Sequence, residues 1–105
     1  MNSADAIRTE DVLQALREVL DPETGLSVVD LGLIYGAEVE PETNRLVVSM
    51  TFTSPGCPAG GAMTDGVERA LARCPGVSGV EVQVTFEPRW TPERITGAGR
   101  AQLGW

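Results

Sequence analysis

Residues 51–58, with the sequence TFTSPGCP, hold the side chains best suited to chemistry in this 105-residue chain. Cys57 lies between an expected strand and an expected helix, so its thiol would meet the unpaired N–H groups and positive dipole end of that helix. This environment favours the thiolate, which makes Cys57 a nucleophile or a soft-metal ligand. Gly56 lets the chain turn and lets a ligand approach the backbone. The alternative is that Cys57 is a small apolar residue beside an ordinary proline–glycine turn.

Carboxylates and hydroxyls elsewhere in the sequence could line a pocket for this thiol. Asp21 and Asp30 could orient a thiol, bind a hard cation or accept a hydrogen bond from Thr51 or Thr53. Alternatively, the two aspartates cap turns and the two threonines are cross-strand partners. For Asp30, which has apolar neighbours on both sides, burial with a specific partner is expected. Glu23 is expected in solvent.

The second cysteine, Cys74, falls on the apolar face of an expected helix, and its position predicts a core residue. Sixteen residues separate it from Cys57, so the pair does not form a Cys-x-x-Cys redox motif. In a reducing compartment, two free thiols are expected rather than a disulfide.

The composition excludes several kinds of catalytic and metal site. The chain has no histidine and no lysine, and all 8 basic residues are arginines. Within one chain this excludes Ser-His-Asp and Cys-His catalysis, histidine-ligated metals, Schiff-base lysines and the Walker phosphate lysine. Two cysteines also cannot supply the four ligands of a structural zinc or of a usual iron–sulfur cluster. A metal here would be shared between chains or completed by oxygen ligands or a small thiol.

The charge balance bears on the class of partner. With 15 acidic and 8 basic residues the formal net charge is −7, and no basic run exists that could follow nucleic-acid phosphates or an anionic membrane. No apolar stretch approaches a transmembrane span, and the N-terminus lacks a secretory signal pattern. We therefore expect a cytoplasmic protein that binds neither nucleic acid nor membrane. Its length predicts one domain over residues 1–105, with residues 1–8 as a flexible lead-in.

The first half of the chain predicts one helix and a hairpin. A helix is expected from Thr9, as its N-cap, to Leu20, and Asp21-Pro22 is expected to end it. Residues 26–33 predict a buried irregular connection. Alternation predicts a strand over residues 34–40, a hairpin loop over 41–45 and a return strand over 46–53. In the return strand one face carries Leu46, Val48, Met50 and Phe52, and the other carries Val47, Ser49, Thr51 and Thr53.

The second half predicts a second helix and a third strand. The helix is expected from Pro58 to Cys74, where Pro75-Gly76 stops it, and the strand over residues 80–87. A short helix is expected in the tail between Ile95 and Leu103. The order helix, strand, strand, helix, strand, short helix indicates an α+β fold. We expect two main helices packed on one face of a small mixed or antiparallel sheet.

Five sequence motifs, taken together in their order and spacing, resemble a known family. They are DPE at residues 21–23, VVDLGLI at 28–34, TFTSPGCP at 51–58, PGV at 75–77 and FEPRW at 86–90. This set is similar to the small iron–sulfur assembly family that includes SufT, the phenylacetate-pathway protein PaaD and the eukaryotic cytosolic iron–sulfur targeting factors. The resemblance extends from about Val12 to Leu103.

The resemblance implies a domain like that at the C-terminus of NifU-like scaffolds, and a role in maturing or delivering iron–sulfur clusters. Its partners would be the assembly machinery and client apo-proteins. It also implies that Cys57 is the functional thiol, with Asp21, Asp30, Thr51 and Thr53 as its candidate neighbours. PaaD-like members carry a cysteine-rich C-terminal extension that this sequence lacks, which places the sequence nearer the short SufT-like form.

Three hypotheses for the function follow. The first is a non-enzymatic assembly factor whose Cys57 thiolate transiently holds iron, zinc or a cluster. A second chain, as in a homodimer, or a client would supply the other ligands, and no permanently bound cofactor is expected. The second hypothesis is a thiol-exchange or redox protein in which Cys57 attacks a substrate. The third is a docking module in which Cys57 is structural and the acidic surface binds a basic partner.

Overall fold

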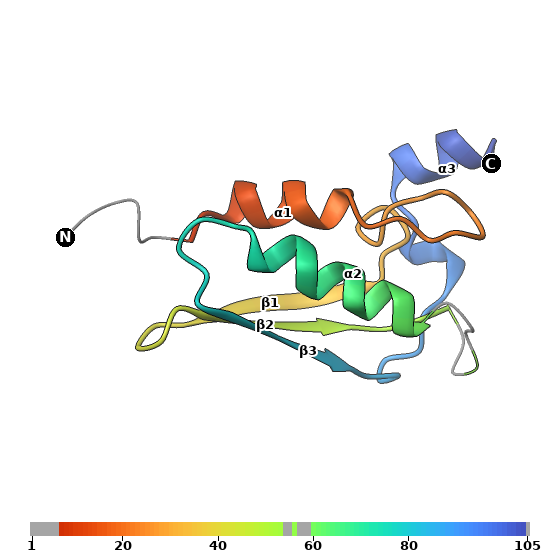
Figure 1. Ribbon diagram of the computed structural model, residues 1–105. Coiled ribbons are helices and arrows are strands. Elements are labelled where there is room, and N and C mark those ends of the chain that lie inside the picture. Colours follow the sequence, from red (N-terminus) through yellow and green to blue (C-terminus); the bar gives the residue numbers. More distant parts are fainter. Residues whose placement is uncertain (1–6, 54–55, 57–59, 105) are drawn as a thin grey trace.

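The computed structural model describes residues 7–53, 56 and 60–104. Two helices lie over one face of a three-stranded sheet, and a third, short helix lies near the C-terminus (Figure 1). The elements in chain order are α1 (Thr9–Arg17), β1 (Ile34–Glu40), β2 (Arg45–Met50), α2 (Gly60–Ala72), β3 (Gly79–Val84), the 3-10 helix η2 (Pro92–Arg94) and α3 (Gly97–Leu103). The predicted α+β class and element order are therefore confirmed.

The sheet is mixed, with the strand order β1-β2-β3. β1 and β2 form an antiparallel hairpin, whereas β2 and β3 are parallel and are joined through α2. Because parallel neighbours need a crossover, α2 is held against the sheet by the chain's connectivity. The segment that leaves β2 and enters α2 therefore lies at the carboxyl end of the parallel pair, and this segment contains Cys57.

The core lies between the sheet and the two main helices, and it also includes residues 26–33. Its least exposed side chains come from α1, α2, β2 and that connection, and they include Leu16, Leu26, Val28, Leu31, Leu33, Leu46, Val48, Met50, Val67 and Leu71. The predicted apolar face of β2 is thus confirmed at Leu46, Val48 and Met50, as is the buried connection between α1 and β1. The apolar residues of the first predicted helix divide, because Leu16 is buried whereas Leu13 and Leu20 are exposed. Apolar burial of this kind is the main force that holds the helices on the sheet.

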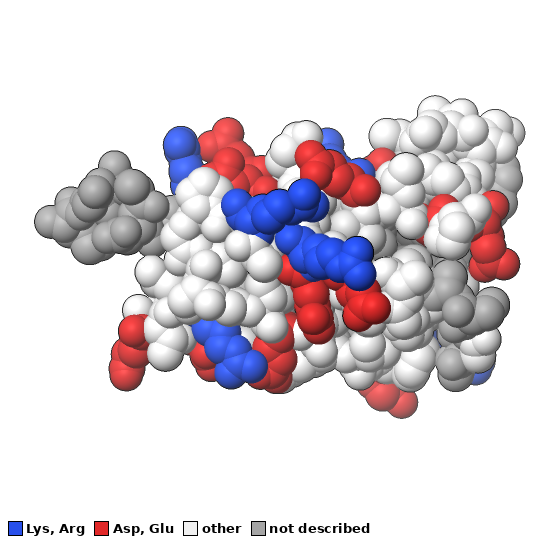
Figure 2. Space-filling view, in the orientation of Figure 1, with Lys and Arg blue, Asp and Glu red and all other residues white. Residues whose placement is uncertain are grey.

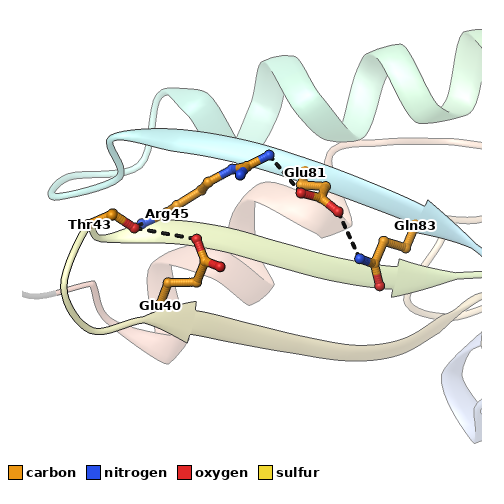
Figure 3. Close-up of polar contacts among 5 residues, drawn as sticks. All are labelled: Glu40, Thr43, Arg45, Glu81 and Gln83. Carbon is orange, nitrogen blue, oxygen red and sulfur yellow. Dashed lines mark hydrogen bonds and ion pairs between the residues drawn. The ribbon is translucent and has the colours of Figure 1, made fainter.

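The opposite face of the sheet carries polar side chains, and no helix of the described residues covers it. Figure 3 shows a line of contacts that runs from the hairpin turn to β3. Arg45 donates to Glu81 at 2.6 Å, and Gln83 donates to the second oxygen of Glu81 at 2.7 Å. Near the turn, the Thr43 hydroxyl donates to Glu40 at 3.4 Å. These groups are exposed, so the Arg45–Glu81 pair adds at most about 1 kcal/mol to stability.

The first helix differs from its predicted bounds at both ends. Arg8 rather than Thr9 is the N-cap, and α1 ends at Arg17 rather than at Leu20. Leu20 instead pairs with Ser27 in an isolated β-bridge, and the Val28 amide donates to the Val19 carbonyl at 2.9 Å. Backbone pairing with the returning chain therefore ends the helix several residues before Pro22.

The strands β2 and β3 are shorter than predicted. β2 ends at Met50, because the next amide, that of Thr51, donates to the Leu33 carbonyl at 2.8 Å instead of continuing the strand. Thr51 is fully buried, although alternation placed it on the face away from the core. β3 ends at Val84 rather than at residue 87, and Phe86 is exposed. The predicted start of α2 at Pro58 lies outside the described residues.

The remaining elements agree more closely with the sequence pattern. β1 has the predicted bounds, and the tail contains the predicted short helix, α3. Thr96 is the N-cap of α3, and its side chain accepts a hydrogen bond from the Gly99 amide at 3.0 Å. Of the predicted lead-in over residues 1–8, residues 1–6 lie outside the described part, while Ile7 packs against the core.

Candidate functional site

The candidate thiol, Cys57, lies outside the described residues, and the structure defines the frame on either side of it. β2 ends at Met50 and α2 is described from Gly60, so the predicted strand-to-helix location of the segment is confirmed. In Figure 1, β2 and β3 end at the same side of the sheet, and α2 begins at that side. A ligand bound there would meet strand ends and the start of a helix, which is a common place for sites in open sheets.

The two threonines before Cys57 differ in their surroundings. Thr51 has no exposed surface, and its hydroxyl donates to the Phe52 carbonyl at 3.4 Å. Thr53 and Gly56 are exposed. Of the two hydroxyls predicted to share a face, that of Thr51 therefore lies in the core, whereas Thr53, four positions before Cys57 in the sequence, is exposed.

Asp21 lies in the turn after α1, where local backbone groups occupy it. Its side chain is 4% exposed, and Oδ1 accepts a hydrogen bond from the Glu23 amide at 2.9 Å. Its backbone closes the turn as well, since the Gly25 amide donates to the Asp21 carbonyl at 2.8 Å. Asp21 thus fits the turn-capping alternative, and Glu23 is exposed as predicted. A role for Asp21 beside the thiol stays a prediction.

Asp30 has the specific partner that its apolar neighbours predicted. The hydroxyl of Thr96 donates to Asp30 Oδ1 at 2.9 Å, and the Thr96 amide donates to the Asp30 carbonyl at 2.9 Å. The Asp30 amide in turn donates to the hydroxyl of Ser27 at 3.0 Å. Two hydrogen bonds from Thr96 therefore fasten the C-terminal tail to Asp30, and a third, from the Asp30 amide to Ser27, holds Asp30 within its own loop.

Two further contacts hold the tail on the same loop. Gly32 has φ +73°, and a Cβ atom there would lie 2.3 Å from the Arg94 carbonyl oxygen, so only glycine fits. The Trp90 indole donates to the Leu31 carbonyl at 2.7 Å. Sequence reasoning missed Gly32 and Thr96 as anchoring residues, and the glycine inside an apolar run was the one local signal that could have indicated a close backbone approach.

Cys74 has the core environment that the sequence predicted. It is 8% exposed, and its Sγ lies 3.6 Å from the Asp11 carbonyl and 3.9 Å from the Ala70 carbonyl. Burial raises the pKa of the Cys74 thiol, and the carboxylates of Asp11 and Glu18 raise it further. A thiol in this state is protonated at neutral pH and is a poor nucleophile or metal ligand.

Arginines gather beside a groove of about 470 Å³ between the end of α1 and α2. Figure 2 shows basic side chains close together over this part of the surface, with acidic side chains around them. The groove is lined by Glu18, Val19, Leu20, Pro22, Ala62, Met63, Gly66, Arg69, Ala70 and Arg73. Because Glu18 faces the same space as the arginines, the groove has no single sign of charge.

Within the described ranges, no group of three or more cysteine, aspartate and glutamate side chains lies close enough to hold a metal ion. Over the same part of the chain, no helix has the length and apolar character needed to cross a membrane.

Comparison with known proteins shows the family of this chain. Residues 9–84 match the family model described as iron–sulfur cluster assembly protein. The chain belongs to this family. A family relative from Staphylococcus aureus, the Fe-S protein maturation auxiliary factor SufT, is 38% identical over 82% of this chain and 97% of its own length. The resemblance to SufT found in the motifs is thereby confirmed.

Two further family comparisons concern the fold and the context of the domain. The crystal structure of a domain of unknown function, DUF59, from Bacillus anthracis has a TM-score of 0.84 and 36% identity over 90% of each chain. An iron–sulfur cluster carrier protein from Synechocystis is 34% identical over 93% of this chain, which spans 26% of the carrier's length. A sequence similar to this chain thus forms one part of a larger carrier protein.

Proposed function

We propose that this protein is a non-enzymatic accessory factor that helps to assemble iron–sulfur clusters or deliver them to client apo-proteins, and that the Cys57 thiolate is its working group. Family membership and the names of the relatives, which are maturation factors and carriers, support the process. The cluster is cargo in this proposal, held in passing rather than as a resident cofactor.

The difference between the two cysteines supports Cys57, rather than Cys74, as the working thiol. Cys74 is buried in the α1–α2 interface with a raised pKa, so it is unsuited to bind iron or attack a substrate. Cys57 belongs to the connection between β2 and α2, flanked by the exposed Thr53 and Gly56. The cysteine left for ligand exchange is therefore Cys57.

One thiolate per chain suits a site that hands its cargo on. Cys57 would supply one sulfur ligand to an iron of the cluster, or to a single iron or zinc ion, and the remaining ligands would come from a second copy, the assembly machinery or the client. Release then needs only ligand exchange, with no change of oxidation state. We expect this handover in the cytoplasm, and a homodimer is one way to complete the ligand set.

The relation to carrier proteins supports the proposed handover. In the Synechocystis carrier a domain similar to this chain is joined to a longer protein. We infer that the domain acts beside the part of a carrier or client that receives the cargo. Thr53 and Gly56 would line the approach to Cys57, while Asp21, Asp30 and Thr51 would support the surrounding backbone.

A complementation experiment tests the proposed function. In a strain that lacks the chain, we expect reduced specific activity and iron content of an iron–sulfur dehydratase, with its protein level unchanged. The wild-type chain and Cys74→Ala should restore both, whereas Cys57→Ser should restore neither. Full restoration by Cys57→Ser would contradict the role of the thiolate. The maturation role itself would be contradicted if the dehydratase and the other iron–sulfur enzymes assayed beside it kept their iron content and activity in the deletion strain.

A further inference from the structure

A continuous groove follows the line where α1 and α2 meet on the surface. Its wider part, of about 470 Å³, lies between the end of α1 and α2, and a second part, of about 330 Å³, extends to Pro75. Glu18, Ala70 and Arg73 line both parts, so the two parts together form one feature, the α1–α2 groove. In Figure 1 the two helices run in opposite directions over the same face of the sheet.

The two walls of the α1–α2 groove carry charges of opposite sign. One wall contains Asp11 of α1 and Glu18, the C-cap of that helix. The other wall contains Arg69 of α2 and Arg73, which lies four residues later and just beyond the end of the helix. Among the described residues, no ion pair joins the two walls. The charges on both walls are therefore available to groups from outside the chain.

The arginines of the groove differ from others in the chain. Arg45 forms an ion pair with Glu81, and Arg100 donates to two backbone carbonyls. The side chains of Arg69 and Arg73 have no such partner in the described part of the chain, although like charges one helical turn apart repel each other. The helix dipole favours cations at this end of α2, but it gives no reason for the acidic wall that faces them.

Between its charged walls the groove is apolar. Val19, Met63 and Ala70 line it and are buried, whereas Leu20 lines it and is 54% exposed. An apolar centre with charged residues at the rim is the usual composition of a protein–protein interface. The groove therefore fits a protein surface that offers an apolar centre and charges of both signs.

A second copy of this chain offers that surface. Two copies can meet groove to groove about a two-fold axis that lies in the plane of contact. If the axis crossed the helices, each α1 would face the other α1 and the two acidic walls would meet. If the axis runs along the helices, each acidic wall faces the basic wall of the partner, which is the favourable arrangement. The charges thus select one of the two orientations.

We propose that two copies of this chain associate through the α1–α2 groove as a two-fold dimer, with the α1 wall of each copy against the α2 wall of the other. Glu18 then faces Arg73 of the partner subunit, the symmetry repeats this contact, and Leu20 is covered. The proposal goes beyond the proposed function, because the dimer does not depend on the Cys57 thiol. The net charge of −7 on each copy opposes association, so we expect a dimer of micromolar affinity.

Sedimentation velocity of the reduced full chain tests the proposal. The wild type should change from monomer to dimer over about 1 to 100 µM, the range in which a micromolar dimer dissociates. Glu18→Arg and Arg73→Glu each place like charges at both symmetry-related contacts, so each should weaken association by about tenfold or more. Circular dichroism confirms that each variant is folded.

Two exposed residues on the same helices provide matched controls. Arg17→Glu on α1 changes the net charge as Arg73→Glu does, and Glu68→Arg on α2 changes it as Glu18→Arg does. Neither Arg17 nor Glu68 lines the α1–α2 groove. Both controls should therefore dimerise within about twofold of the wild type, because only the overall repulsion changes.

A mixture of the two groove variants separates the specific contact from a general effect of charge. In a heterodimer of Glu18→Arg with Arg73→Glu, the introduced arginine faces the introduced glutamate, and the two native side chains face each other at the second contact. The equimolar mixture should therefore regain the dimer that neither variant forms alone. Native mass spectrometry identifies this heterodimer by the summed mass of two different chains.

Three results would overturn the proposal: a wild type that stays monomeric over this range, equal weakening by Arg17→Glu and Arg73→Glu, or a mixture that forms no heterodimer. These results are separate from the complementation result, since no variant alters Cys57. If Cys57→Ser restores client activity while the mixture forms the heterodimer, the proposed function fails and the dimer stands. If Cys57→Ser restores nothing while the wild type stays monomeric, the function stands and the dimer fails.

Discussion

The loop over residues 20–33 and the strand exit over residues 51–53 both carry polar side chains that could serve a site, but they use them differently. In the loop, Asp21 caps its own turn and Asp30 binds Thr96 in the tail. At the strand exit, Thr51 is buried with one long hydrogen bond, at 3.4 Å, and Thr53 faces solvent. The polar groups of the loop thus hold the structure together, whereas the strand exit leaves the Thr53 hydroxyl exposed a few positions before Cys57 in the sequence.

This difference shows that similar residue types in one set of motifs can have separate roles. A carboxylate that accepts a hydrogen bond from a specific partner is an anchor, and the energy of that bond is lost if the group turns toward a ligand. The chemistry of the protein is therefore expected at the strand exit, and the stability of the tail is expected to depend on the loop.

Gly32→Ala should have the largest effect on stability. Alanine at φ +73° is strained, and its methyl group would overlap the backbone of Arg94, so we expect a loss of about 3 kcal/mol or more in the free energy of unfolding. Gly25→Ala is the matched control, because Gly25 has φ +75° but an open surrounding, and its loss should be about 1 kcal/mol. Urea denaturation measures both. Equal losses would show that Gly32 does not hold the tail by close approach.

Asp30→Ala should destabilise the protein by about 2 kcal/mol, because the Thr96 hydroxyl loses a charged acceptor. Asp30→Asn retains an oxygen acceptor and should lose less than half as much. Neither variant should alter the rate at which Cys57 is alkylated in the folded protein. A changed alkylation rate in Asp30→Asn, with stability near wild type, would place Asp30 in the thiol's pocket and break the division.

The pH dependence of stability should reveal Cys74. Burial raises the pKa of this thiol above its ordinary value of 9.0, so the folded state binds the proton more tightly than the unfolded state. The stabilising contribution is fully present below the unfolded pKa and is lost as the pH rises through the folded pKa. The free energy of unfolding of the wild type should thus fall more steeply above pH 9 than that of Cys74→Ala. Parallel pH curves would show that Cys74 is accessible in the folded state.

Thr53→Val should have the smallest effect on stability, within about 0.5 kcal/mol, because the side chain is exposed. If Thr53 lies beside the thiol, the same change should reduce restoration of dehydratase activity in the complementation strain. Thr53→Ser, which keeps the hydroxyl, should restore it. Equal restoration by all three chains would remove Thr53 from the candidate site.

The sequence predicted the features that depend on residues close together in the chain better than those that depend on residues far apart. The bounds of β1 followed from alternation and the proline after it, and the core position of Cys74 followed from helical spacing. The predicted end of α1 was wrong, because the bridge between Leu20 and Ser27 is a pairing between separate segments, which local helix propensity does not indicate. The partner of Asp30 lies 66 positions away, and no local pattern indicates it.

The candidate site shows the same limit. The motif around Cys57 predicted a strand-to-helix connection, and the motif set indicated the family, because both depend on residues near one another in sequence. The burial of Thr51 and the hydrogen bond from its amide to the Leu33 carbonyl depend on how the connection over residues 26–33 meets the end of β2. Such contacts follow from the packed structure rather than from residue type and spacing.

The most direct test of the account is the content of iron and acid-labile sulfide in protein expressed and purified without oxygen. Wild type, Cys57→Ser and Cys74→Ala are prepared identically, and zinc is measured in the same samples. We predict iron together with sulfide in the wild type and in Cys74→Ala, and loss of both in Cys57→Ser. Iron and sulfide retained at the wild-type level in Cys57→Ser, or absent from all three proteins, would contradict the claim that the Cys57 thiolate holds the cluster.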